Sequence, residues 1–123
     1  MGWLRLGVGV VLIAVPGPFL RLTDEDRATG TAVLLLRTIG IRDLALGLGT
    51  IRAARTGSDD ELRAWTRGAL TSDSLDVVAS VAGAGAIGVG AALGAATAAA
   101  AFAVGDAVAL GRLAGAGSAP PPS

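Results

Sequence analysis

The sequence predicts an all-α protein, a polytopic bundle of four transmembrane helices, on three observations. Of its 123 residues 52% are hydrophobic, while only 16% are charged and 3% aromatic. The apolar residues are mostly Ala, Gly, Leu and Val, a mixture typical of membrane helices, whose small residues let backbones approach closely. Apolar runs also recur along the chain after each polar segment. A soluble domain of this size needs more charge to cover its surface.

The first two expected spans cover residues 3–20 and 31–51. The first is short, because Pro16 and Pro18 kink or end a helix near the far interface. The helix that contains the second span is expected to begin near Asp24 with Thr23 as its N-cap.

The long apolar stretch after Gly68 exceeds the roughly 20 residues of one span, so it is expected to contain two antiparallel helices. These are the third and fourth spans, residues 69–87 and 91–111, with a turn at Gly88-Val89-Gly90.

Two signals punctuate the chain between the second and third spans. Gly57 is a natural C-cap, and Ser58 with Glu61 has the form of a capping box that opens a short interfacial helix. Residues 1–112 thus form one four-helix transmembrane domain. The Pro/Gly/Ser-rich tail, residues 113–123, is expected to be disordered.

The arginines flanking the spans predict the orientation. Six fall on the side shared by the termini and the 52–67 loop, and two fall on the other side. By the positive-inside rule the termini and this loop face the cytoplasm, which predicts a multi-pass protein of the cell inner membrane. The six are Arg5, Arg52, Arg55, Arg63, Arg67 and Arg112, and the two are Arg21 and Arg27.

Charged residues interrupt the predicted spans. A charge at the bilayer centre costs roughly 2.5–3.5 kcal/mol on insertion scales, so such residues are usually paired and often functional. With a rise of about 1.5 Å per residue, most of them share one level in the cytoplasmic half of the bundle, and Arg37 alone lies nearer the outer surface. The predicted intramembrane charge network consists of Arg37, Arg42, Asp43, Asp73, Asp76 and Asp106.

Arg42 cannot be neutralised, so it needs an acidic partner, and the preferred partners are Asp76 and Asp106. Asp43 is expected to meet a second helix. Two arginines face four aspartates in the spans. Either two acids reach the interface or at least one carries a proton at neutral pH. A structural network and a proton-linked or ligand-linked network therefore both stay open.

Several glycines are placed where helices would pack closely. Those of the fourth span lie on a stripe that would pack inside the bundle or against a second copy. The predicted packing positions are Gly40, Gly47, Gly83, Gly90, Gly94 and Gly105.

The composition also limits the chemistry. Cysteine, histidine and tyrosine are absent, and the net charge is zero. No catalytic residue, metal ligand or cofactor site is therefore predicted, and no nucleic acid is expected as a partner. The expected partners are the lipid bilayer and either a second copy or a larger membrane complex.

The motif R-x-x-G-x-R-D-x-x-x-G runs from Arg37 to Gly47, and Gly105-Asp106 lies in the fourth span. In these residues the chain resembles a family of small four-helix integral membrane proteins of unknown function, over about residues 3–112. A looser likeness exists to other four-helix families, including the DoxX-like membrane proteins. The resemblance implies the four-helix fold and the charged site, and it implies no activity.

Three functions are compatible with this sequence. The first is a structural or accessory membrane component held together by a buried Arg–Asp network. The second is a proton-linked small transporter subunit that uses the surplus aspartates. The third is a membrane enzyme acting on a lipid or quinone, which the absence of His, Cys and Tyr disfavours.

Overall fold

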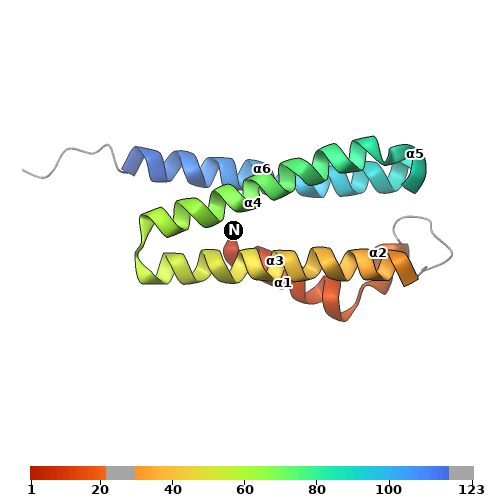
Figure 1. Ribbon diagram of the computed structural model, residues 1–123, viewed down its shortest axis with the longest axis horizontal. Coiled ribbons are helices and arrows are strands. Elements are labelled where there is room, and N and C mark those ends of the chain that lie inside the picture. Colours follow the sequence, from red (N-terminus) through yellow and green to blue (C-terminus); the bar gives the residue numbers. More distant parts are fainter. Residues whose placement is uncertain (22–29, 117–123) are drawn as a thin grey trace, which may run out of the picture.

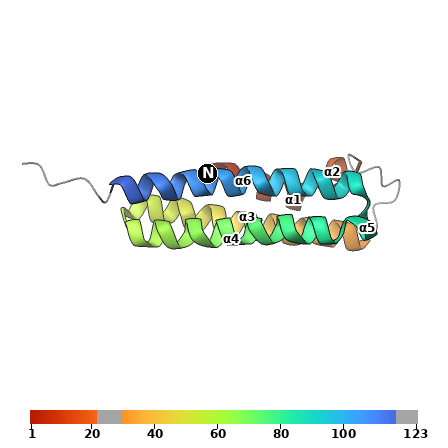
Figure 2. The ribbon, with the colours of Figure 1, turned by 90° about the horizontal axis from the view of Figure 1, so that it is seen from above.

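The computed structural model describes residues 1–21 and 30–116, and every regular element in these two ranges is an α-helix. In Figure 1, α1 lies along α3 in one layer and α6 lies along α4 in the other. Figure 2 shows the molecule from above, with α6 over α1 and α4 over α3. The elements are α1 (Gly2–Ala14), α2 (Gly17–Arg21), α3 (Gly30–Thr56), α4 (Asp59–Ala82), α5 (Ala84–Ile87) and α6 (Val89–Ala116).

The connection between α3 and α4 follows the predicted caps. Gly57 has a φ of +71°, a left-handed conformation that glycine adopts without steric cost and that ends α3. The hydroxyl oxygen of Ser58 accepts a hydrogen bond from the backbone N–H of Glu61 at 3.3 Å, which starts α4. The C-cap at Gly57 and the N-cap at Ser58 are confirmed, whereas the second bond of a capping box, from the backbone N–H of Ser58 to the side chain of Glu61, is not among the hydrogen bonds of the described residues.

Two expected helix boundaries are wrong. α4 runs from Asp59 to Ala82, so the stretch expected as a short interfacial helix continues without a break into the third helix, which ends before the expected residue 87. An isolated glycine such as Gly68 costs a helix only about 1 kcal/mol, and the buried residues on either side of it hold the helix together. The turn also comes earlier than Gly88–Gly90, because Gly83 ends α4 and the single turn α5 precedes Gly88, whose φ is +86°.

The ends of the other predicted segments also shift. The span expected at 3–20 is divided into α1 and α2, because Pro16 lacks the N–H that would continue the helix beyond Val15. α6 continues through Ala116, so residues 113–116 are helical and not part of a disordered tail. The rest of that tail, and the start proposed near Asp24 for the second helix, lie outside the described residues.

Glycines bring α1 and α3 into close contact, with the two helices antiparallel. A Cβ on Gly9 would lie 2.6 Å from the carbonyl oxygen of Gly40, and a Cβ on Gly40 would lie 2.8 Å from that of Gly9. At the other end of the contact, a Cβ on Gly47 would lie 2.8 Å from the carbonyl oxygen of Gly2. The structure thus places Gly40 and Gly47 in a helix-packing contact, where any larger residue would push the backbones apart.

The polarity of the bundle is inverted relative to a soluble domain. The largest fully buried side chains are those of Arg5 and Asp73. Large apolar side chains point outward instead, with exposed fractions of 65% for Leu34, 64% for Val78 and 65% for Val104. Such a surface is apolar over much of its extent, and the interior contains charges and small residues.

Within the described residues, one helix is both long and apolar enough to cross a membrane, the Val89–Gly115 part of α6. α1 is apolar but shorter, and α3 and α4 are interrupted by charges such as Arg42 and Asp73. Taken one at a time, the helices therefore support one span and not the four that were predicted.

The α1–α3 contact can be tested by replacing Gly9 with alanine. The new Cβ would meet backbone atoms of α3, which cannot rotate away, so we expect a loss of about 1–3 kcal/mol of stability. Gly7→Ala is the matched control, because nothing lies within 4 Å of its Cβ position. Thermal unfolding followed by circular dichroism measures both variants. Equal melting temperatures for the two would contradict the close contact.

Candidate functional site

The centre of the bundle is Arg5, a residue that the sequence places at the membrane surface. Its side chain is 1% exposed and lies between the two helix layers. Arg5 was expected among the arginines at one end of the bundle, and the structure buries it among the helices instead. The reason is the register of α1, whose first residue Gly2 packs beside Gly47 and Ile51, so Arg5 lies as deep in the bundle as Asp43.

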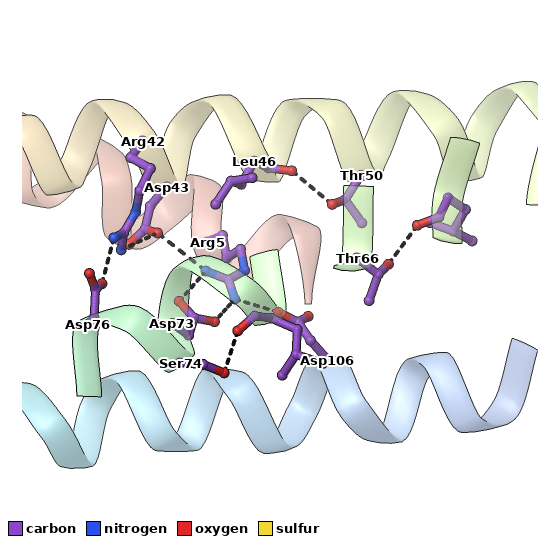
Figure 3. A network of polar contacts seen from close by, with 12 residues as sticks. Arg5, Arg42, Asp43, Leu46, Thr50, Thr66, Asp73, Ser74, Asp76 and Asp106 are labelled. Atoms are coloured by element: carbon purple, nitrogen blue, oxygen red, sulfur yellow. Dashed lines mark hydrogen bonds and ion pairs between the residues drawn. The ribbon is translucent and has the colours of Figure 1, made fainter. Parts of the chain in front are cut away.

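The guanidinium of Arg5 bonds to carboxylates on three other helices (Figure 3). Nη1 donates to Oδ1 of Asp43 on α3 at 3.3 Å and to Oδ1 of Asp73 on α4 at 3.2 Å. Nη2 donates to Oδ2 of Asp73 and, at 2.5 Å, to Oδ2 of Asp106 on α6. One side chain of α1 thus connects α1 with α3, α4 and α6.

The face of the guanidinium is covered as well as its edge. Its central carbon lies 4.6 Å from the ring centroid of Phe102, a cation–π contact. Phe102 precedes Asp106 by four residues, so both occupy one face of α6. Nε of Arg5 is buried and finds no acceptor among the described residues, so the carboxylates hold the guanidinium by its two terminal nitrogens.

A second arginine extends these contacts toward the α2 and α5 end of the bundle. Nη1 of Arg42 lies 2.6 Å from Oδ2 of Asp76, which agrees with the first of its two predicted partners. The second prediction is wrong, because Asp106 bonds to Arg5 instead. Nη2 of Arg42 also lies 3.5 Å from Oδ1 of Asp43, the carboxylate that Arg5 shares.

Together these residues form the Arg–Asp network, which has two parts of different accessibility. The side chains of Arg42 and Asp76 are 29% and 35% exposed, whereas none of the four at the centre exceeds 6%. Arg37 does not belong to it, because its side chain is exposed and makes no ion pair with any described residue. The members of the network are Arg5, Arg42, Asp43, Asp73, Asp76 and Asp106.

The network has more acids than bases. Its two guanidinium groups face four carboxyl groups, and both guanidinium groups contact Asp43. No group of three or more possible metal ligands was found in the described residues that could hold an ion. The arrangement can therefore link the helices to one another, and its excess of carboxyl groups can hold a net negative charge inside the bundle.

Local sequence explains how each helix presents its charge inward. The buried residues of α1 include Gly2, Arg5 and Gly9, at spacings of three and four that define one helix face. Gly40, Asp43 and Gly47 on α3 repeat the same spacing. This repeat is the signal that could have identified Arg5 from the sequence, since it places a charge on the glycine-lined face of an apolar helix.

The remaining predicted packing glycines do not behave alike. Gly105 meets the side chain of Met1, so it serves a contact between α6 and the start of α1. Gly83 is the C-cap of α4 and faces its own helix. A Cβ on Gly90 or Gly94 would meet nothing within 4 Å, so neither packs within the described chain. The packing prediction is therefore wrong for Gly83. It is also wrong for packing of Gly90 and Gly94 inside the bundle, because these two glycines lie on the outer side of α6.

Comparison of the chain with protein-family models, with curated proteins and with solved structures gives no match.

The geometry predicts that Arg5 matters more to stability than Arg42. In Arg5→Leu three buried carboxylates lose their shared partner, and breaking a buried ion pair costs about 3–5 kcal/mol. Arg42→Leu breaks a pair that is about one-third exposed, so we expect a loss of about 1 kcal/mol. Arg37→Leu is the control and should leave the melting temperature nearly unchanged. A larger loss for Arg42→Leu than for Arg5→Leu would contradict this assignment.

Proposed function

We propose that this chain is a small multi-pass membrane protein that acts as a structural or accessory component, with the Arg–Asp network holding its helices in register. The observation that carries the proposal is the inverted polarity of the bundle. Charged side chains such as Arg5 and Asp106 are buried, at 1% and 2% exposure, while Leu93 and Val104 on the outside are 63% and 65% exposed. Water favours the opposite distribution, and a hydrocarbon solvent favours this one.

The network also accounts for spans that composition alone does not support. Taken alone, α3 and α4 carry too many charges to be apolar membrane spans. Inside the bundle these charges are largely turned toward one another. At about 1.5 Å per residue, α3, α4 and α6 are all longer than the roughly 30 Å hydrocarbon core. α1 is shorter and needs α2 to complete its crossing. We therefore propose four spans, the first formed by α1 and α2 together.

The positive-inside rule supports an orientation with the α3–α4 connection in the cytoplasm. With Arg5 buried, five arginines remain at that end of the bundle, and Arg21 lies toward the other end. Arg27, the second arginine expected there, lies outside the described residues. The start of α1 and the end of α6 are at the cytoplasmic end in this arrangement, which fits the inner membrane of a cell. The family resemblance carried by Arg37–Gly47 is consistent with this proposal.

Single-cysteine labelling tests the membrane topology, because the chain has no cysteine of its own. Asp60→Cys lies at the proposed cytoplasmic end, and Gly85→Cys lies in α5 at the other end. In intact cells a membrane-impermeant maleimide should label Gly85→Cys and leave Asp60→Cys unlabelled. Permeabilised cells should label both, which is the control. Labelling of Asp60→Cys alone would reverse the orientation, and release of the protein by alkaline carbonate would contradict membrane residence.

The surplus of acids favours a second candidate, a proton-linked small transporter subunit. Asp76 is the most exposed carboxyl group of the network, and it connects through Arg42 and Asp43 to the buried centre. A bundle of four spans encloses little volume, so transport would require a homo-oligomer or a larger membrane complex.

Thermal stability in detergent across pH 5–8 separates the two candidates. A purely structural network should give a constant melting temperature in this window, which is the result we expect. A proton-linked network should give a melting temperature that changes with pH in wild type and changes differently in Asp76→Asn. In that case the structural role would be wrong and transport would become the leading function.

A further inference from the structure

The cytoplasmic end of the bundle, as proposed above, carries a group of arginines from three helices. Gly57 and Ser58 connect α3 to α4, so arginines shortly before and after this connection lie at one end of the molecule (Figure 1). Nη2 of Arg63 donates to the carbonyl oxygen of Leu113 at 3.0 Å, which brings the end of α6 to the same level. We call this group the arginine collar: Arg52, Arg55, Arg63, Arg67 and Arg112.

Two members of the collar already have partners in the protein. Arg63 lies 3.3 Å from Oδ1 of Asp60 and 3.9 Å from Oδ2 of Asp59, so it pairs with two of the three acids at the start of α4. The guanidinium of Arg55 lies over the ring of Trp3, 5.4 Å from its centroid. These contacts fix Arg63 and Arg55 to the folded chain.

The other three members are exposed and make no ion pair or side-chain hydrogen bond with any described residue. They come from three different helices: Arg52 from α3, Arg67 from α4 and Arg112 from α6. These three cationic side chains, which have no partner among the described residues, form a positive surface at one end of the bundle.

Tryptophan marks the depth of this surface. A Cβ on Gly49 would overlap the ring of Trp65, so Trp65 of α4 lies one turn deeper than Arg52 of α3. The ring of Trp3, on α1, lies against the guanidinium of Arg55. α4 also carries one arginine of the collar on each side of Trp65 along its axis, so the tryptophans lie at the level of the collar. Tryptophan is enriched at the membrane–water interface, and its presence among the arginines supports an interfacial position for the collar.

We propose that the arginine collar binds the phosphate groups of anionic lipids in the leaflet that it faces. The proposal rests on the membrane residence proposed above. Arginine presents paired N–H donors that match phosphate oxygens, and basic residues at a membrane surface attract anionic lipid. Asp59, Asp60 and Glu61 form the first turn of α4, and the first two pair with Arg63. None of these acids makes an ion pair with Arg52, Arg67 or Arg112, which leaves the three arginines available.

The test uses the full chain purified in a neutral detergent. Short-chain phosphatidylglycerol is titrated into the micelles, with phosphatidylcholine of the same chain length as the uncharged comparison, and the melting temperature is recorded. The variant Arg52→Gln/Arg67→Gln/Arg112→Gln removes the three charges that have no partner in the described part of the chain. The matched control Arg21→Gln/Arg37→Gln removes two exposed arginines outside the collar.

We expect phosphatidylglycerol to raise the melting temperature of wild type and of the control more than phosphatidylcholine does. In the triple variant the apparent affinity for phosphatidylglycerol should fall by about tenfold or more, because each arginine near an anionic surface contributes to binding. High salt should weaken the effect in wild type, because it screens exposed charges.

Three results would overturn the proposal: equal shifts with the two lipids, an unchanged response in the triple variant, or the same stabilisation by inorganic phosphate alone. The last would assign the collar to a soluble anion. Failure of the membrane proposal itself looks different. In that case the protein stays monodisperse without detergent and does not float with vesicles of either lipid.

Discussion

The contacts between the guanidinium of Arg5 and three aspartates are the interaction on which the rest of the structure depends. The α1–α3 and α4–α6 pairs are each packed closely, and the contact between the pairs is less extensive. α4 lies near α3 where the chain connects them and diverges from it toward α5 (Figure 1). Arg5 is on one pair, while Asp73 and Asp106 are on the other. Ion pairs therefore contribute to the position of one pair relative to the other, beside the side-chain packing between α3 and α4.

Glycine packing and charge pairing depend on each other in this bundle. Gly2, Arg5 and Gly9 share one face of α1, and Gly40, Asp43 and Gly47 share the corresponding face of α3. Because the helices are antiparallel, with Gly2 beside Gly47 and Gly9 beside Gly40, contact between the glycines brings Arg5 and Asp43 to nearly the same level. A larger residue at a glycine position would separate the backbones and lengthen the 3.3 Å contact between the two charges. The glycines thus determine which charges can meet.

Local signals in the sequence predicted much of this fold, and tertiary register explains what they missed. The all-helical class, the left-handed Gly57 and the Ser58 cap follow from residues near one another in the chain. The pairing of Arg42 with Asp76 followed from counting depth along two helices. Arg5 was missed because its depth depends on where α1 lies along α3, which is decided by contacts between distant glycines. A positive residue near the start of an apolar run otherwise indicates a membrane surface.

The inverted polarity and the scarcity of large buried side chains have one physical explanation in the proposed membrane setting. Hydrocarbon solvates leucine and valine as well as a protein interior does, so burying them contributes little to helix association there. Close backbone contact and polar bonds remain as the sources of specificity, and both are found here, at Gly9 and Gly40 and around Arg5. Removing the charges would leave two apolar pairs that can associate in many registers. The surplus of carboxyl groups is not needed for that role, since one carboxylate per helix would suffice to align Arg5. Asp76 pairs with Arg42 and not with Arg5, so it is the member of the network that the alignment of Arg5 does not explain.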